Sequence, residues 1–370
     1  GYIDDYRGWN VQSETDNGVY QGGHGTEVMG MIGVKGNNEN GLTGINWDVK
    51  IMSVAGENLM NEASIVAAYT YPLVQRQIYN ATQGESGAFV VVTNASWGLD
   101  GANPEDYPIW SAIYDTLGTH GILNCGATSN NNVNIDIVGD VPTAVPSDYM
   151  ISVTATNRYD VRTFSGFGAN TIDLGAPGEN VRTTSGSNGT TTTSGTSFAS
   201  PLTAGVIALL YATPCIDFAQ MVKNNPKLAA DYVRHALLTG VDPVANLQNE
   251  TKTGGRLNAF NSLQLILDDC ENDLCLPVFS LDYEVQNDSI LVFSWSASQD
   301  TTTTVRFKMT AAQEWTYIQN IDTNSLSIDS LTFCTDYEFQ VASDCSGSAG
   351  QADCDGARAG RARCGGRCRA

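Results

Sequence analysis

Residues 195–201 read Gly-Thr-Ser-Phe-Ala-Ser-Pro, and the apolar run from Leu202 to Leu210 follows them directly. The small residues predict a tight turn that leads into a helix, with Ser197 at the junction. A serine hydroxyl is a weak nucleophile unless a base accepts its proton, and the dipole at a helix N-terminus favours negative charge. The stretch therefore predicts that Ser197 is a nucleophile whose base is a histidine elsewhere in the chain.

Of the three histidines, His24 has the sequence context of a general base. It lies in Gly-Gly-His-Gly-Thr at 22–26, where the glycines leave its ring accessible. His120 precedes an expected buried strand and His235 lies in an expected amphipathic helix, so structural roles are favoured for both. The two segments resemble the subtilisin-like serine proteases, whose catalytic histidine sits in His-Gly-Thr and whose nucleophile sits in Gly-Thr-Ser-x-Ala-x-Pro. The resemblance implies an endopeptidase in which His24 activates Ser197.

The composition limits the classes of partner. The chain has 370 residues, 19 basic against 40 acidic side chains and a formal net charge of −21. This length allows more than one domain. Nucleic acids and anionic membranes require a basic face, so both are excluded as expected partners. The longest apolar candidate, 204–210, falls short of the roughly 20 residues of a membrane span. We expect a soluble protein with no membrane span that acts on polypeptide substrates.

The nine cysteines favour an oxidising location. Those that flank expected domain ends are Cys215, Cys270, Cys275, Cys334 and Cys345. Secreted proteins use disulfides in this way, so we expect a secreted protein or one at the cell surface. The spacing does not decide the pairing, and reduced buried cysteines are the alternative, above all for Cys125. The chain begins with Gly1, so an export signal is neither present in it nor excluded.

Between residues 49 and 155, short apolar runs alternate with segments of helical spacing, which is typical of an α/β domain. The runs 49–55, 89–95, 121–125 and 150–155 are too uniformly apolar for half-exposed strands and predict a buried parallel sheet. Helices are expected at 62–81, where Pro72 should kink or split the helix, and at 107–119. Right-handed crossovers would then give a doubly wound sheet.

Three more helices are expected after the serine. The segment 197–212 is apolar on nearly all sides, as in a buried core helix, and Pro201 is expected near its first turn, where backbone donors are free. An amphipathic helix is expected around 228–237. The Gly-Arg-Leu-Asn turn at 255–258, before a helix that ends near Asp268, resembles the end of the family's catalytic domain. We therefore place the peptidase domain at 1–270.

From Leu276 the pattern changes to period two, which predicts a small antiparallel β-sandwich. Over 276–350 it resembles a fibronectin type III domain without a visible last strand. In this resemblance Trp295 is the early core tryptophan, and Leu331 with Tyr337 corresponds to a tyrosine corner. Such a domain would bind protein or carbohydrate, or act as a spacer. Residues 351–370 are rich in Arg, Gly, Ala and Cys, and we expect an artefactual or disordered tail there.

The resemblance implies further site residues. The segment 121–130 resembles the family strand that ends in Ala-Gly-Asn, which makes Asn130 the oxyanion donor together with the backbone N–H of Ser197. Ser129 replaces the usual glycine, and two more asparagines follow at 131 and 132, so the assignment has a one-residue ambiguity.

A second segment, Thr-Asn-Ala-Ser-Trp-Gly at 93–98, resembles the family segment that pairs with an extended substrate. By this match Ser96, Trp97 and Gly98 would bind peptide as an added strand. A plain strand end with a core tryptophan is the alternative.

The loop 35–42 resembles a family loop that holds a structural calcium ion. Asn38, Asn40 and Leu42 would supply side-chain and carbonyl oxygens, which suit a hard cation. A solvated turn is the alternative, since Gly and Asn are common in turns. The chemistry itself is expected to require no cofactor.

The orienting acid of the triad is missing from its expected place. The family order is Asp, His, Ser, with the aspartate in Asp-Ser/Thr-Gly about thirty residues before the histidine. Only 23 residues precede His24, and Asp4 and Asp5 lead into Tyr-Arg-Gly instead. We expect the aspartate upstream of Gly1, which would leave these 370 residues nearly inactive alone.

Two hypotheses follow. In the first, the intact protein is a secreted serine endopeptidase that forms an acyl-enzyme on Ser197. In the second, it is a non-catalytic adhesive or binding protein on a subtilisin-like scaffold.

Overall fold

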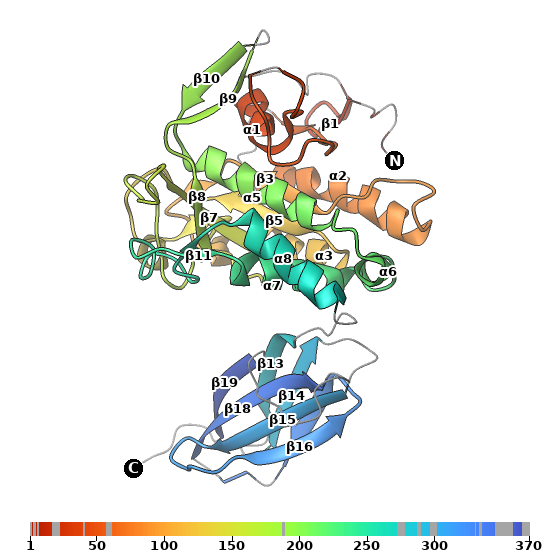
Figure 1. Cartoon of the computed structure of the whole chain (residues 1–370), viewed down its shortest axis with the longest axis vertical. Helices are drawn as coiled ribbons and strands as arrows, with labels where there is room; N and C mark the ends of the chain where they lie inside the picture. The colour runs from red at the N-terminus through yellow and green to blue at the C-terminus, as the bar shows by residue number, and fades with distance from the viewer. Residues whose placement is uncertain are drawn as a thin grey trace. The chain divides into compact units, whose positions relative to one another are not determined.

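The chain divides into two compact units, Gly1–Leu267 and Asp268–Ala370 (Figure 1). The computed structural model describes residues 2, 5, 7–16, 23–39, 41–56, 61–186, 189–271, 278–286, 290–296, 302–329, 331–332, 335–344 and 358–364.

The first unit is built on a six-stranded sheet in the order β11-β12-β8-β7-β5-β3. Its strands are β3 (Val92–Ala95), β5 (Leu123–Ala127), β7 (Met150–Thr156), β8 (Leu174–Pro177), β11 (Asp242–Pro243) and β12 (Gly255–Arg256). Neighbours from β3 to β12 pair in parallel and β11 pairs antiparallel with β12, so the sheet is mixed. β5 and β7 are buried along their whole length, as expected for strands covered on both faces.

The helices of this unit are α1 (Gly23–Gly33), α2 (Glu62–Ala81), α3 (Pro108–Thr119), α4 (Ile135–Val138), α5 (Thr196–Leu210), α6 (Ile216–Asn224), α7 (Pro226–Thr239) and α8 (Ala259–Glu271), with the 3₁₀ turn η1 (Pro104–Asp106). α5 contacts β3, β5, β7 and β8, and it is buried as predicted (Figure 1). α2 has the predicted bounds, and Pro72 does not split it. None of the described helices is long and apolar enough to cross a bilayer.

The predicted strand at 49–55 is wrong. Only Val54–Ala55 forms a strand, β2, and it pairs in parallel with β1 (Trp9–Asn10) outside the main sheet. Val49 packs against α1 instead, where a Cβ placed on Gly33 would lie 2.8 Å from its Cγ1 atom. The α/β prediction is confirmed, with a mixed sheet in place of an all-parallel one because β11 pairs antiparallel with β12.

The prediction for Pro201 is also wrong. α5 begins at Thr196, so Pro201 is its sixth residue and lies beyond the first turn. In an α-helix the N–H of residue 201 would donate to the carbonyl of Ser197, and proline has no N–H. The Ser197 carbonyl therefore loses its helical partner.

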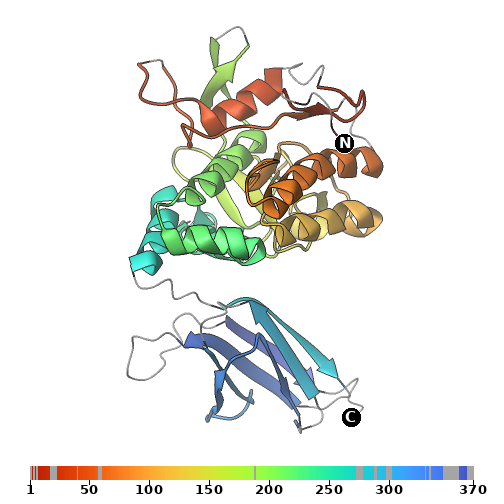
Figure 2. The same ribbon diagram turned by 90° about the vertical axis from the view of Figure 1, so that its right-hand side faces the viewer.

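A hairpin packs on the helix that contains His24. The short strand pairs outside the main sheet are β9 (Val181–Ser185) with β10 (Gly189–Thr193), and β4 (Leu99–Asp100) with β6 (Asp140–Val141). β9 lies beside α1 (Figure 2), where the Thr183 hydroxyl donates to the Glu27 carbonyl at 2.6 Å and the Thr184 hydroxyl donates to the Thr26 carbonyl at 2.7 Å. These contacts hold α1 against β9.

The second unit contains two antiparallel sheets, in the orders β13-β14-β17 and β16-β15-β18-β19. The strands are β13 (Phe279–Gln286), β14 (Ile290–Ser296), β15 (Thr302–Met309), β16 (Thr316–Ile321), β17 (Ser325–Ile328), β18 (Thr335–Asp344) and β19 (Arg358–Cys364). Buried residues from both sheets, such as Phe293, Val305 and Phe339, form one hydrophobic cluster. An artefactual or disordered tail is expected at 351–370; within that stretch Arg358–Cys364 forms β19, which pairs with β18.

Candidate active site

Two parallel strands end beside the N-terminus of α5. β3 and β5 pair in register from Val92 with Leu123 to Ala95 with Gly126, so both chains leave the sheet at the same edge. α5 contacts both strands. Ser96, which follows β3, and the loop at 128–130, which follows β5, therefore lie next to Ser197.

Asn130 is held by the residue that precedes Ser197. Its Oδ1 atom accepts the backbone N–H of Thr196 at 2.9 Å. An N–H group only donates, so the amide atom that faces Thr196 must be oxygen, and Nδ2 points away from it. Nδ2 has no hydrogen-bond partner among the described residues, so it is able to donate to a ligand.

The two neighbouring asparagines face other groups. The Asn131 side chain donates to Asp100 at 3.1 Å, and the Asn132 side chain accepts from Arg162 at 2.7 Å. Of the three consecutive asparagines, Asn130 is the one that the structure places against α5.

Ser197 is the second residue of α5, and its side chain is half-buried. Its hydroxyl donates to the carbonyl of Ser96 at 3.2 Å, and the hydroxyl of Ser96 donates to the carbonyl of Ser197 at 2.8 Å. Its backbone N–H is one of the first four of the helix, which have no intrahelical acceptor.

His24 lies near Ser197 on a separate helix. It is the second residue of α1, it is exposed, and its ring lies edge-on to Phe198, with the centroids 5.9 Å apart. Val28 and Met31 of α1 pack with Phe198 in one buried cluster, which holds the two helix N-termini together. In the described part of the chain, no hydrogen bond joins the His24 ring to the Ser197 hydroxyl. Catalytic hydrogen bonds are often long before substrate binds.

No described carboxylate contacts the His24 ring. Asp5 accepts hydrogen bonds from the Tyr71 hydroxyl at 2.9 Å and from the Gln75 amide at 3.0 Å, so its carboxylate faces α2. Asp4 lies outside the described residues. The aspartate that would orient His24 stays a prediction.

The other two histidines lie elsewhere in the fold. His120 caps the C-terminus of α3, and its Nδ1 atom lies 2.9 Å from the Thr116 carbonyl oxygen. His235 lies on α7.

The predicted substrate segment follows β3. Trp97 is half-buried and stacks on Trp110 with ring centroids 5.6 Å apart, so its side chain belongs to the core, as in the alternative reading of this segment. Gly98 is exposed, and a Cβ there would lie 2.6 Å from the Val141 carbonyl. The close approach of β4 to β6 therefore requires glycine at position 98.

A buried carboxylate supports the Asn130 loop, and no sequence motif indicated it. Asp140 is 1% exposed, and its Oδ2 atom accepts from the Thr128 hydroxyl at 2.9 Å, the Thr143 hydroxyl at 2.5 Å and the Ser129 N–H at 3.2 Å. Burial raises the pKa of Asp140 to about 6, while the hydrogen bonds from Thr143 and Thr128 act in the opposite direction. In the sequence, an aspartate after a glycine resembles an ordinary turn.

The predicted calcium loop is a tight turn. Asn37 and Glu39 have φ values of 55° and 62°, Asn38 is exposed and Leu42 is half-buried. Asn40 lies outside the described residues. No group of three or more His, Cys, Asp or Glu side chains suited to a metal ion occurs in the described part of the chain.

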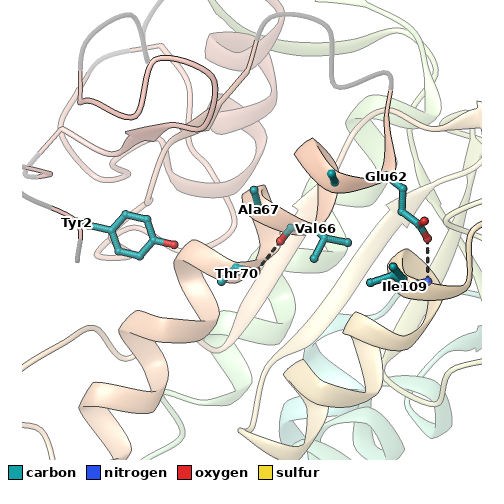
Figure 3. A pocket seen from close by; sticks show the side chains of 7 residues that line it. Tyr2, Glu62, Val66, Ala67, Thr70 and Ile109 are labelled. Atoms are coloured by element: carbon teal, nitrogen blue, oxygen red, sulfur yellow. Dashed lines mark hydrogen bonds between the residues drawn. The ribbon is translucent and has the colours of Figure 1, made fainter.

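A cavity of about 530 Å³ lies away from these residues, beside α2 (Figure 3). It is lined by Tyr2, Glu62, Ala63, Val66, Ala67, Thr70 and Ile109. None of the predicted site residues lines it.

The sequence profile of the subtilase family, Peptidase S8, matches residues 1–254. The cell wall-associated protease of Bacillus subtilis (strain 168) is 27% identical over 244 residues, which cover 64% of this chain and 23% of that protein. Subtilisin-like protease 1 of Plasmodium berghei (strain Anka) is 23% identical over 285 residues, which cover 71% and 43%. The chain therefore spans less than half of either relative.

A solved structure described as the structural basis of subtilase cytotoxin SubAB assembly is similar in fold. The TM-score is 0.53 at 22% identity, and the match covers 68% of this chain and 78% of that chain.

Proposed function

The chain belongs to the subtilase family, and from that membership we propose that it is the peptidase part of a serine endopeptidase that acts through Ser197. The observation that supports this proposal best is the meeting of three segments at the N-terminus of α5. Ser197 is the second residue of α5, Asn130 accepts the Thr196 N–H at 2.9 Å, and the His24 ring lies edge-on to Phe198. These are the nucleophile, oxyanion and base positions of acyl transfer.

The proposed reaction begins when the Ser197 hydroxyl turns from the Ser96 carbonyl to the His24 ring. His24 accepts the proton as Oγ attacks the substrate carbonyl, and later returns it to the leaving amine. The negative oxygen of the tetrahedral intermediate would receive hydrogen bonds from Asn130 Nδ2 and from the Ser197 N–H. The dipole of the 15-residue helix α5 favours negative charge at the same place.

The proposed substrate is an extended polypeptide. The backbone of residues 96–98 would pair with it as an added strand, because main-chain hydrogen bonds recognise a peptide whatever its side chains are. Since the Trp97 side chain packs on Trp110, we assign the binding to the backbone.

We further propose a structural calcium ion at the loop formed by Asn38, Asn40 and Leu42. Oxygen ligands on a tight turn suit this cation, which would stabilise the loop without entering the chemistry. Adding calcium should raise the melting temperature of the unaltered chain more than that of an Asn38→Ala variant.

For the second unit we propose a fibronectin type III-like sandwich that binds protein or carbohydrate, or acts as a spacer. The Tyr337 hydroxyl accepts the N–H of Thr332 at 3.0 Å, a bond to an upstream backbone group that would suit the proposed tyrosine corner. Trp295 on β14 is only 5% exposed and belongs to the cluster shared by both sheets.

We propose that the protein is secreted or lies at the cell surface. Cys215 and Cys270 are both disulfide-bonded, whereas Cys125 is free and buried in β5. Disulfides persist in oxidising compartments.

Labelling with a serine-directed fluorophosphonate tests the enzymatic proposal. The full-length protein, with the region in which the orienting aspartate is expected, should be labelled, and its Ser197→Ala variant should not. Ser194→Ala is the matched control, because Ser194 lies in the preceding loop and its hydroxyl accepts only the Asn180 N–H. Labelling of the Ser197→Ala variant, or no labelling of the unaltered protein, would favour the non-catalytic binding protein instead.

A further inference from the structure

The carbonyl of Ser197 needs a hydrogen-bond donor from outside its own helix. In α5 its partner would be the N–H of residue 201, and Pro201 has none. Leaving a carbonyl without a partner where folding removes it from water is unfavourable. The same proline motif that identifies the nucleophile therefore leaves the nucleophile's own peptide group unsatisfied.

The hydroxyl of Ser96 supplies the missing donor. Ser96 Oγ lies 2.8 Å from the Ser197 carbonyl oxygen. Ser96 follows Ala95, which is 2% exposed and paired with Gly126 in the sheet, so the donor comes from a rigid strand end. The hydroxyl of Ser197 returns a bond to the Ser96 carbonyl at 3.2 Å, so two hydrogen bonds join residues 96 and 197.

Two further side chains set the direction of this hydrogen bond. A carbonyl only accepts, so Ser96 must donate to Ser197 and accept the Asn94 amide, whose Nδ2 atom lies 2.9 Å from Ser96 Oγ. The Oδ1 atom of Asn94 then accepts the hydroxyl of Ser200 at 2.7 Å. These hydrogen bonds form a series in which Ser200 donates to Asn94, Asn94 donates to Ser96, and Ser96 donates to the carbonyl of Ser197. The series begins and ends on α5.

We propose that Ser96 is a positioning residue for the nucleophile, and that its hydroxyl, oriented by Asn94, holds the Ser197 peptide group in place of the N–H that Pro201 lacks. The inference rests on the proposed function of Ser197. Without this bond the first turn of α5 is free to shift, and Oγ moves relative to His24 and Asn130. A displacement of about 1 Å costs roughly a hundredfold in rate.

Two variants separate orientation from bulk. Ser96→Ala removes the hydroxyl and keeps the backbone that would pair with substrate. Asn94→Asp keeps the size of the side chain, but an ionised carboxylate only accepts, so it would take the proton of Ser96 away from the Ser197 carbonyl. Thr93→Val is the matched control, because its hydroxyl lies on the same strand and donates instead to Asn124 at 2.7 Å.

The measurement is fluorophosphonate inactivation of the full-length protein, resolved into the maximal rate kinact and the half-saturating concentration KI. Ser96→Ala and Asn94→Asp should each lower kinact at least tenfold with KI unchanged, Ser96→Thr should restore most of it, and Thr93→Val should match the unaltered protein. Equal kinact in Asn94→Asp and Thr93→Val, or a change confined to KI, overturns the inference. Failure of the unaltered protein to react at all refutes the proposed function itself.

Discussion

Replacing Gly30 by alanine should separate α1 from the β9 hairpin. A Cβ at this position would lie 2.5 Å from Thr183 Oγ1 and still closer to Thr184 Oγ1. Neither hydroxyl can rotate away without losing a hydrogen bond, because the two donate to the carbonyls of Glu27 and Thr26. The helix that contains His24 must therefore move, or two hydrogen bonds must break.

The expected magnitude follows from comparison with a second glycine on the same helix. Overpacking of this kind costs about 1–3 kcal/mol. Glycine to alanine inside a helix otherwise stabilises by roughly 0.5–1 kcal/mol. Gly25 is on α1 too, and no atom lies within 4 Å of a Cβ placed there. The helix-propensity gain is common to both variants, so Gly30→Ala should be about 1–3 kcal/mol less stable than Gly25→Ala.

Urea unfolding followed by the helical circular-dichroism signal measures this difference, because all the described helical residues except the last four of α8 belong to the first unit. The m-values of the two variants should agree, so that the shift in midpoint reports the free energy of unfolding. Gly30→Ala should also react more slowly with fluorophosphonate, since His24 moves with α1. Equal stabilities of the two variants would refute the packing argument.

Three further changes test other parts of the structure. Asn130→Ala should lower kcat about 10²–10³-fold, the usual cost of one oxyanion donor and a range that comes from subtilisin itself, with KM nearly unchanged in steady-state peptide hydrolysis. Because burial raises the pKa of Asp140 to about 6, its ionisation lowers the free energy of unfolding as pH rises from about 4 to 6. Asp140→Asn has no carboxylate to ionise and does not lose this stability. Its free energy of unfolding, measured by urea titration relative to the unaltered chain, should therefore rise by up to about 3 kcal/mol from about pH 4 to 6. A difference that does not change with pH would contradict the raised pKa of Asp140. Tyr337→Phe should cost the second unit about 0.5–1.5 kcal/mol in thermal unfolding through the lost bond to Thr332, and an unchanged melting temperature would show that this bond contributes nothing.

Local patterns predicted the long elements well. α2 begins at Glu62 and ends at Ala81, and α5 is buried as its apolar run indicates, because burial on all sides leaves no polar face in the sequence. The strand at 150–155 was found for the same reason, since β7 is covered on both faces. The run at 49–55 has similar composition, yet it packs on α1 rather than in the sheet. None of its residues is buried, and Ile51 is 40% exposed. A short apolar run therefore does not by itself establish that a segment joins the buried sheet.

Local motifs likewise predicted some residues of the candidate site and missed others. The motifs around His24 and Ser197 indicated both residues directly, because each motif lies within a few consecutive positions. Asp140 lies in no motif, and the motifs that contain Asn94 and Ser200 did not indicate their hydrogen bonds, because these bonds depend on partners on other elements. The sequence did not decide which of the three consecutive asparagines faces α5. In the structure Asn130 accepts the N–H of Thr196.

By itself, then, the sequence determined the family and predicted a nucleophile and its base, because these depend on short runs of neighbouring residues. The tertiary structure alone decided how the Ser197 peptide group is held. Pro201 removes a hydrogen bond inside α5, and Ser96, more than a hundred positions earlier in the chain, restores it across the edge of the sheet. A hydrogen bond between distant segments depends on how the sheet and helix pack, and no local pattern of residues encodes that packing.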